Sequence, residues 1–223
     1  MKFAIINLGC KVNAYEAEAV SEELIENGWQ RVEMEEDPDA TIVFTCAVTN
    51  TAAAKSRKIL HRAKRMKENA ITVLVGCYVQ VNDGMLDEAD ILVGTANKKN
   101  VPQYLQTYIE KHEKIRDISS LKDVKFDSLQ SSVLDSKARC DLKIQDGCNQ
   151  FCSYCVIPYA RGKERSMDPD LAVQECKKLA KKYKEIVLTG IHTGRYGKEY
   201  GITLADLLGR MLQETEQVRF RIS

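Results

Sequence analysis

Cysteine carries the most distinctive chemistry in this sequence. Three of its eight cysteines, Cys148, Cys152 and Cys155, form a C-x3-C-x2-C pattern. Three thiolates this close together can cover one side of a metal centre. Structural zinc usually takes four ligands, commonly in two separated pairs, and no fourth ligand is evident near this loop. The pattern therefore favours a four-iron cluster with one iron left open, and zinc is the alternative.

Three further cysteines each come at or just past the end of a short apolar run. They are Cys10, Cys46 and Cys77. Because the carboxyl ends of parallel strands meet at one edge of a sheet, we expect these three side chains to converge. The alternative is three independent buried thiols, since cysteine is commonly buried. The regular placement favours a second metal site.

The remaining candidates have weaker signals. Cys176 shares a helical face with Ala172 and Tyr183, which predicts core packing, and Cys140 has no assigned role. His192 is a lone loop histidine and is also left unassigned. Eight cysteines without a secretory signal indicate free or metal-bound thiols in a reducing, cytoplasmic setting.

Composition sets the broad class. The chain has 223 residues, of which 44% are hydrophobic and 29% charged, as in ordinary globular proteins with one large or two small domains. No apolar run reaches the roughly 18 residues that a membrane span needs, so no membrane segment is predicted. The net charge of +1 excludes a globally basic nucleic-acid protein but not a local basic patch.

Short apolar runs alternate with helical patterns over residues 1–112. Strands are expected at 2–8, 41–46, 71–76 and 89–94, and helices after the first, second and fourth of them. Asn13 is the expected N-cap of the first helix, with Glu16 completing a capping box. The alternation predicts an α/β fold whose N-terminal domain is a small doubly wound parallel sheet.

Residues 113–136 read as a linker that could include a short strand. Strand and helix signals resume over 137–223, with strands at 140–145, 185–190 and 218–222 and helices capped by Asp168 and Thr203. Three strands with two crossover helices do not close a barrel. This second domain is therefore predicted to be the N-terminal part of a β/α barrel, and the chain is expected to be a fragment or a truncated product.

Five stretches carry a resemblance that covers essentially the whole chain. In order they are NLGCKVNAYE, FTCAVTNTAAAKSR, GCYVQ, LKIQDGCNQFCSYCVIPYARGKERS and IVLTGIHTGRYG. Together they resemble the methylthiotransferases, a family of radical S-adenosylmethionine (SAM) enzymes. LGCKVN-x-YE and GIHTG-x-YG are similar to the branch that modifies N6-threonylcarbamoyladenosine at position 37 of tRNA. Family members are about twice this length, so the chain alone is expected to turn over poorly.

The resemblance implies two [4Fe-4S] clusters and SAM as cofactors. Cys148, Cys152 and Cys155 would hold the radical SAM cluster, and Cys10, Cys46 and Cys77 an auxiliary one. One SAM would methylate a sulfur ligand of the auxiliary cluster. A second would yield the radical that takes hydrogen from adenine C2, where the methylthio group is inserted. In an enzyme of this kind the cofactor carries out the removal of hydrogen from adenine C2, and the protein's side chains position the reactants.

Further roles follow from the resemblance alone. Tyr154, Thr189 and Gly190 would contact SAM. The substrate would be tRNA, and an electron donor such as flavodoxin or ferredoxin would supply the reducing electron. The competing interpretation is an iron–sulfur or zinc module that binds RNA or transfers electrons without radical chemistry.

One segment is strongly basic. Seven Lys or Arg residues occupy positions 55–67 without an acid between them, whereas residues 1–54 hold ten acidic and three basic residues. Arg62 and Arg65 are therefore candidate RNA contacts, with a solvated helix face as the alternative. A second basic set flanks the cysteine loop and could line an RNA entrance: Arg139, Lys143, Arg161, Lys163 and Arg165.

Overall fold

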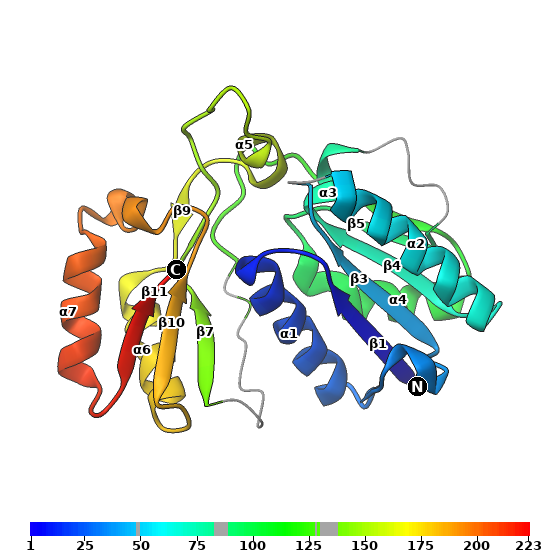
Figure 1. The fold of residues 1–223 in the computed structure, drawn as a ribbon, viewed down its shortest axis with the longest axis horizontal. Coiled ribbons are helices and arrows are strands. Elements are labelled where there is room, and N and C mark those ends of the chain that lie inside the picture. The colour runs from blue at the N-terminus through cyan, green and yellow to red at the C-terminus, as the bar shows by residue number, and fades with distance from the viewer. Residues whose placement is uncertain (48–49, 83–88, 128, 130–137) are drawn as a thin grey trace.

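The chain forms two α/β units that lie side by side (Figure 1). The computed structural model describes residues 1–47, 50–82, 89–127, 129 and 138–223. A six-stranded sheet builds the N-terminal unit and a three-stranded sheet builds the C-terminal unit. The predicted α/β class is therefore confirmed. No helix in these ranges is long and apolar enough to cross a membrane.

The larger sheet is parallel throughout and has the order β2-β1-β3-β4-β5-β6. Its strands are β1 (Lys2–Asn7), β2 (Gln30–Arg31), β3 (Ala40–Thr45), β4 (Ile71–Gly76), β5 (Ile91–Val93) and β6 (Ile115–Asp117). Strands β3, β4 and β5 are buried along their whole length, which explains their nearly continuous apolar runs. The chain reverses its strand order between β1 and β3, where such sheets bind ligands.

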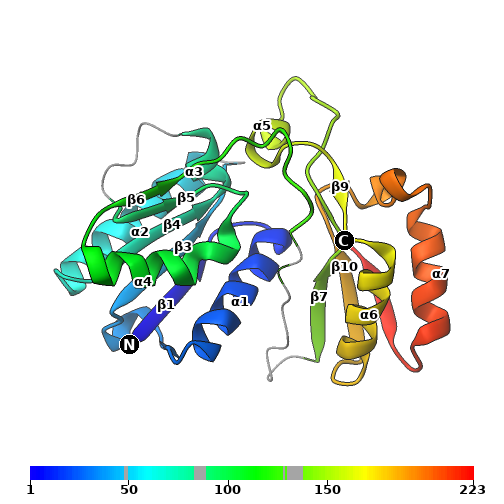
Figure 2. The same cartoon turned by 180° about the vertical axis from the view of Figure 1, so that it is seen from behind.

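Helices cover both faces of this sheet, as in a doubly wound domain. α1 (Lys11–Glu26) and α4 (Val101–Lys111) pack on one face through Val20, Leu24 and Leu105. α2 (Asn50–Met66) and α3 (Cys77–Val81) pack on the other through Leu60 and Val79. Figure 2 shows α4 and α1 in front of the sheet, with α2 beyond it. The 3-10 turns η1 (Met34–Glu36) and η2 (Lys98–Asn100) complete the unit.

Strand β6 lies within the segment predicted as a linker. It pairs with β5 in parallel, with Ile91 opposite Ile115 and Val93 opposite Asp117. The short strand considered for the linker therefore exists, and it extends the N-terminal sheet past residue 112.

The C-terminal unit has strand order β11-β10-β7, all parallel. Its strands β7 (Arg139–Lys143), β10 (Glu185–Thr189) and β11 (Arg219–Ile222) share a core with α6 (Pro169–Ala180) and α7 (Leu204–Glu214). Cys176 is fully buried in this core, as predicted. Asp168 caps α6 by accepting from the backbone of Asp170 and Leu171, and Thr203 caps α7.

The connection between β7 and α6 spans residues 144–168. It contains the antiparallel pair β8 (Gln145–Asp146) and β9 (Arg165–Ser166), with α5 (Ile157–Arg161) between them. Two 3-10 turns, η3 (Thr193–Arg195) and η4 (Lys198–Tyr200), follow β10. No sequence signal was assigned to these elements because all are five residues or shorter.

The capping-box prediction for α1 is wrong. The helix begins at Lys11, with Cys10 at the N-cap position and no side-chain cap. Asn13 and Glu16 lie inside the helix and are both 1% exposed. Their side chains bond across to the other unit, so the pattern that resembled a cap has a tertiary cause. Ile25, near the C-terminal end of the helix, is 49% exposed.

Candidate active site between two cysteine centres

The first cysteine trio occupies one edge of the large sheet. Cys10 follows β1, Cys46 follows β3 and Cys77 follows β4, and these three strands are neighbours in the order β1-β3-β4. Cys10 and Cys46 thus flank the point where the strand order reverses. The structure places the three residues at adjacent strand ends, as the sequence predicted.

The second trio lies on the β8–α5 loop. The loop is anchored at Cys148, whose backbone N–H donates to Gly162 O at 3.1 Å, and it turns where Cys155 N–H donates to Cys152 O at 2.9 Å. Gly147 precedes the loop with φ +71°, and a Cβ there would lie 2.0 Å from Lys163 O. Glycine is therefore required at the loop entrance.

Gln145 links this loop to the end of β10, a role that its sequence context did not reveal. Its buried side-chain amide donates to Asp146 O at 2.9 Å and Gly147 O at 2.8 Å. Its Oε1 accepts from the backbone N–H of His192 at 2.7 Å. The cysteine loop and the turn after Gly190 are therefore held in register by one side chain.

A groove of about 330 Å³ joins the two units. From the N-terminal unit it is lined by Cys10, Lys11 and Val12, and from the C-terminal unit by Ile157, Thr189, Gly190, Ile191 and Ser223. Lys11 Nζ donates to Ser223 Oγ at 2.8 Å across it. Cys10 of the predicted auxiliary site and the predicted SAM contacts Thr189 and Gly190 therefore line the same groove.

The other predicted SAM contact lies apart from this groove lining. The Tyr154 ring is 90% exposed on the cysteine loop, so this structure gives it no partner that would fix its position. His192 Nδ1 is 3.9 Å from Cys148 Sγ, which brings the unassigned histidine next to the radical SAM trio.

A buried charge cluster connects the two units beside the first trio. Glu16 of α1 pairs with Lys143 at 2.6 Å, with Arg161 at 3.2 Å and with Lys98. Asp146 pairs with Lys143 at 2.8 Å and with Arg161 at 3.0 Å. Because these partners come from α1, η2, β7, β8 and α5, the cluster fixes how the units face each other.

Arg165 adds a fourth cation to this cluster. Its Nη2 is 3.0 Å from Asp146 Oδ2. Lys143, Arg161 and Arg165 are therefore buried, and the prediction that they line an RNA entrance is wrong. These cations instead form ion pairs with Glu16 and Asp146 where the two units meet. The sequence showed the cations but not the carboxylates that they meet.

Charge and burial compete in this cluster. Burial alone would raise the pKa of Glu16, but the charges of Arg161, Lys143 and Lys98 hold it well below its ordinary value. The pKa of Asp146 is likewise held well below its usual range, chiefly by Lys143 and Arg161 against burial. Burial also raises the pKa of the Cys77 thiol, and the charges of Arg161 and Lys98 oppose that shift.

The two cysteine trios are better suited to binding iron–sulfur clusters than single metal ions. No three Cys, His, Asp or Glu side chains in the described ranges are grouped to hold one metal ion. A [4Fe-4S] cluster spreads its thiolate ligands over different irons and is held by cysteines. All six candidate cysteines are free thiols, and the cations beside Cys77 suit an anionic cluster.

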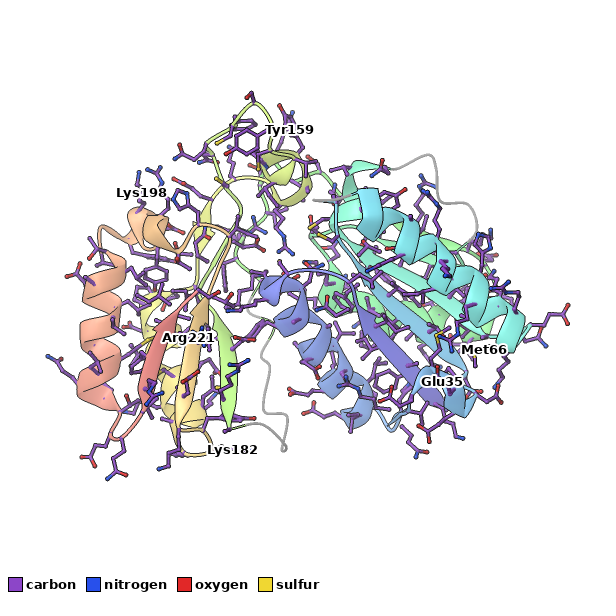
Figure 3. The ribbon with its side chains drawn as sticks, viewed as in Figure 1. Glu35, Met66, Tyr159, Lys182, Lys198 and Arg221 are labelled. Atoms are coloured by element: carbon purple, nitrogen blue, oxygen red, sulfur yellow. The ribbon has the colours of Figure 1, made fainter. Side chains whose placement is uncertain are left out.

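The basic helix α2 is partly neutralised. Arg62 pairs with Glu35, Lys64 with Asp90 at 3.3 Å, and Lys67 with Asp39 at 2.8 Å. Glu35 and Met66 lie at the end of the N-terminal unit away from Tyr159 of α5 (Figure 3). Arg62 and Arg65 are in the C-terminal half of α2 and thus lie far from the cysteine edge.

Comparison with known proteins gives one family match in each of the two units. The model of "Uncharacterized protein family UPF0004" matches residues 2–94, and that of the "Radical SAM superfamily" matches residues 142–222. The chain thus contains a radical SAM domain.

Similar proteins carry related names. A protein from Bacillus subtilis (strain 168), "Threonylcarbamoyladenosine tRNA methylthiotransferase MtaB", is 38% identical over 99% of this chain and 50% of its own length. The protein of the same name from Aquifex aeolicus is 38% identical over 96% of this chain and 53% of its own length. A "tRNA-2-methylthio-N(6)-dimethylallyladenosine synthase" from Clostridium botulinum is 36% identical over the whole chain and 52% of its own length. The chain therefore spans about half of these relatives.

Proposed function

We propose that this chain belongs to the methylthiotransferase family of radical SAM proteins and that it acts in 2-methylthiolation of N6-threonylcarbamoyladenosine at position 37 of tRNA. The proposal extends to two [4Fe-4S] clusters, to SAM and to an electron donor such as flavodoxin or ferredoxin. The names of the two relatives at 38% identity support the threonylcarbamoyl substrate over the dimethylallyl one.

The groove between the units is the observation that carries this proposal. It brings Cys10 of the N-terminal trio to the same space as Thr189 and Gly190 at the end of β10. A reaction that uses sulfur from one centre and a radical from another needs both next to one substrate atom. An electron-transfer module would not need a shared pocket for a third molecule.

This chain's residues supply binding and positioning. The clusters and SAM, when bound, supply one-electron chemistry and sulfur. Gln145 and Gly147 hold the cysteine loop in one conformation against the end of β10. The buried cluster around Glu16 holds the two centres at a set separation. Gly190 faces Gln145 so closely that an added Cβ would lie 3.0 Å from Gln145 Cβ.

Anaerobic reconstitution tests the cofactor content. About eight irons per chain, with an electron paramagnetic resonance (EPR) signal that changes when SAM is added, would support two clusters and radical SAM chemistry. Zinc in place of iron would overturn the assignment. Removal of Cys148, Cys152 and Cys155 should abolish the response to SAM but leave the N-terminal iron.

The substrate is tested separately. The reconstituted protein is incubated with SAM, reductant and tRNA carrying either threonylcarbamoyl- or dimethylallyl-adenosine, and the digested nucleosides are analysed by mass spectrometry. Methylthiolation of the first alone supports the proposal, and methylthiolation of the second alone moves the chain to the other branch.

Binding of tRNA is measured with the charge-reversal variant Arg62→Glu/Arg65→Glu. If the C-terminal half of α2 is an RNA contact, affinity should fall and the dependence of log K on log salt should flatten by about one per lost phosphate contact. Lys181→Glu/Lys182→Glu, at the far end of the C-terminal unit, is the matched control (Figure 3). Equal binding by both variants would remove α2 from the interface.

A further inference from the structure

The buried charge cluster has more cations than carboxylates. Lys98, Lys143, Arg161 and Arg165 face Glu16 and Asp146. Asp127 is a third nearby carboxyl group, and its buried Oδ2 has no hydrogen-bond partner in the described part of the chain. Even with Asp127 ionised, the described groups hold one more positive than negative charge. Uncompensated buried charge is costly, so an anion is expected next to this cluster.

Arg161 connects the cluster to the first cysteine trio. It is the last residue of α5, Cys77 is the first residue of α3, and these two helices pack together. The charges of Cys77 and Cys10 act on the guanidinium, as do those of Glu16 and Asp146. An arginine from the C-terminal unit therefore lies where α5 packs on α3, close enough to Cys77 for their charges to interact.

The guanidinium is held in one orientation with one donor left over. Nη1 donates to Glu16 at 3.2 Å and to Asp146 at 3.0 Å, and Nη2 donates to Asn13 and to Glu16 at 3.3 Å. Nε is buried and has no hydrogen-bond partner among the described residues. Asn13 is itself fixed because its Nδ2 donates to Thr45 O at 2.7 Å, one residue before Cys46.

We propose that Arg161 is a cluster-binding residue: carried by the radical SAM unit, it closes the Cys10–Cys46–Cys77 site and donates its free N–H to a sulfur of the cluster held there. The inference rests on the auxiliary cluster of the proposed function. When bound, that iron–sulfur cluster would supply the anion that the buried cations require and a hydrogen-bond acceptor for Arg161 Nε.

Two consequences follow from this arrangement. Hydrogen bonds to cluster sulfurs and nearby positive charge favour the reduced, more negative state of a cluster. Arg161 therefore raises the reduction potential of the auxiliary cluster. Arg161 also makes the auxiliary iron–sulfur cluster depend on docking of the two units, because this residue, which covers the cluster, comes from the C-terminal unit.

The test uses the chain with Cys148, Cys152 and Cys155 replaced by Ala, so that only the N-terminal cluster can form. Iron content and an EPR-monitored redox titration are recorded for this parent and for Arg161→Gln and Arg161→Lys. We expect Arg161→Gln to lower the equilibrium constant for one-electron reduction of the cluster at least tenfold. This corresponds to a reduction potential that is more negative by 59 mV or more. Arg161→Lys should shift it in the same direction by less, since the charge remains but Nε is lost.

Arg165→Gln is the matched control. Arg165 is also buried, pairs with the same Asp146 and has an Nε without a hydrogen-bond partner among the described residues, whereas Arg161 is the cation that chiefly opposes the raised pKa of Cys77. A shift confined to Arg161 variants supports the proposal. Equal potentials in all variants, or equal shifts in Arg161→Gln and Arg165→Gln, would overturn it. A parent that binds no iron would instead refute the auxiliary cluster itself and with it this role of Arg161.

Discussion

The two cysteine centres are built in opposite ways. Cys148, Cys152 and Cys155 lie on one loop, anchored by backbone hydrogen bonds to Gly162 and within the loop itself. The N-terminal trio is spread over three strand ends and is backed by buried charges from the other unit. The loop centre is thus a local structure, whereas the strand-end centre depends on tertiary and interdomain packing.

This difference decides what each centre should tolerate. A change that loosens the packing of α1 against β7 and α5 should disturb the strand-end centre first, because Glu16 and Asn13 are the residues that join them. The loop centre should respond mainly to changes within its own loop. Each of the following variants tests one side of that contrast, beginning with the largest expected effect.

Glu16→Gln is expected to cost about 3–5 kcal/mol of unfolding free energy. The substitution removes the carboxylate that faces Lys98, Lys143 and Arg161, all of which are at most 2% exposed. Lys98 would lose the carboxylate that it pairs with, and Lys143 and Arg161 would share Asp146 with Arg165. Urea unfolding of the cluster-free protein, followed by the fluorescence of its single tryptophan, Trp29, measures the loss.

Glu18→Gln is the control on the same helix. Glu18 pairs with Arg31 at 2.6 Å, but the two side chains are 23% and 36% exposed. Solvent screens such a pair, so its loss should cost about 0.2–1 kcal/mol. Equal effects of the two substitutions would mean that the buried cluster does not hold the units together.

Acid should weaken the same contacts. The folded-state pKa values of Glu16 and Asp146 are lowered, so their stabilisation is complete above the unfolded values of about 4.3 and 3.9. Below that, the unfolded chain binds protons that the folded chain does not. Stability is therefore lost as pH falls from about 5 towards the folded values, by up to about 1.4 kcal/mol per pH unit for each carboxylate.

Urea titrations at successive pH values check this slope. In Glu16→Gln one of the two carboxylates is absent, so the slope between pH 4 and pH 3 should fall by about 1.1 kcal/mol per unit relative to the parent. An unchanged slope would show that other carboxylates govern acid sensitivity.

Asn13→Ala is expected to cost about 1–3 kcal/mol, because it leaves Thr45 O and an Arg161 N–H without their partner. Asn27→Ala is the control: Asn27 donates to Glu23 O at 2.7 Å at the exposed end of the same helix, and the effect there should be smaller. Denaturant midpoints compare the two. A larger loss from Asn27→Ala would contradict the interdomain role of Asn13.

The sequence was most informative where structure is local. Strand β4 and the capped starts of α6 and α7 match their predicted positions, because apolar runs and caps act over a few residues. The cysteine edge was also predictable, since parallel strands necessarily end together. Asn13 and Glu16 were misread as a cap because their partners, Arg161 and Lys143, lie over a hundred positions away.

Charge gave the least reliable local signal. Lys143, Arg161 and Arg165 had the composition of a phosphate-binding surface, yet burial against Glu16 and Asp146 gives them a different role. No spacing rule links a carboxylate on α1 to cations on β7 and α5. The short elements β8, β9 and α5 were missed for the related reason that their conformation depends on contacts such as that of Gln145 with Gly147.

The smallest effect is expected at His192. Its Nδ1 is 3.9 Å from Cys148 Sγ, a long separation even for a hydrogen bond to sulfur, and its backbone N–H already donates to Gln145. With Cys10, Cys46 and Cys77 replaced by Ala, His192→Ala should bind the same iron per chain as its parent, whereas Cys148→Ala should lose the cluster. Iron and sulfide analysis after anaerobic reconstitution measures both. A loss of iron in His192→Ala as large as that in Cys148→Ala would make the histidine a ligand, and the loop centre would then depend, like the strand-end centre, on a residue from outside its own loop.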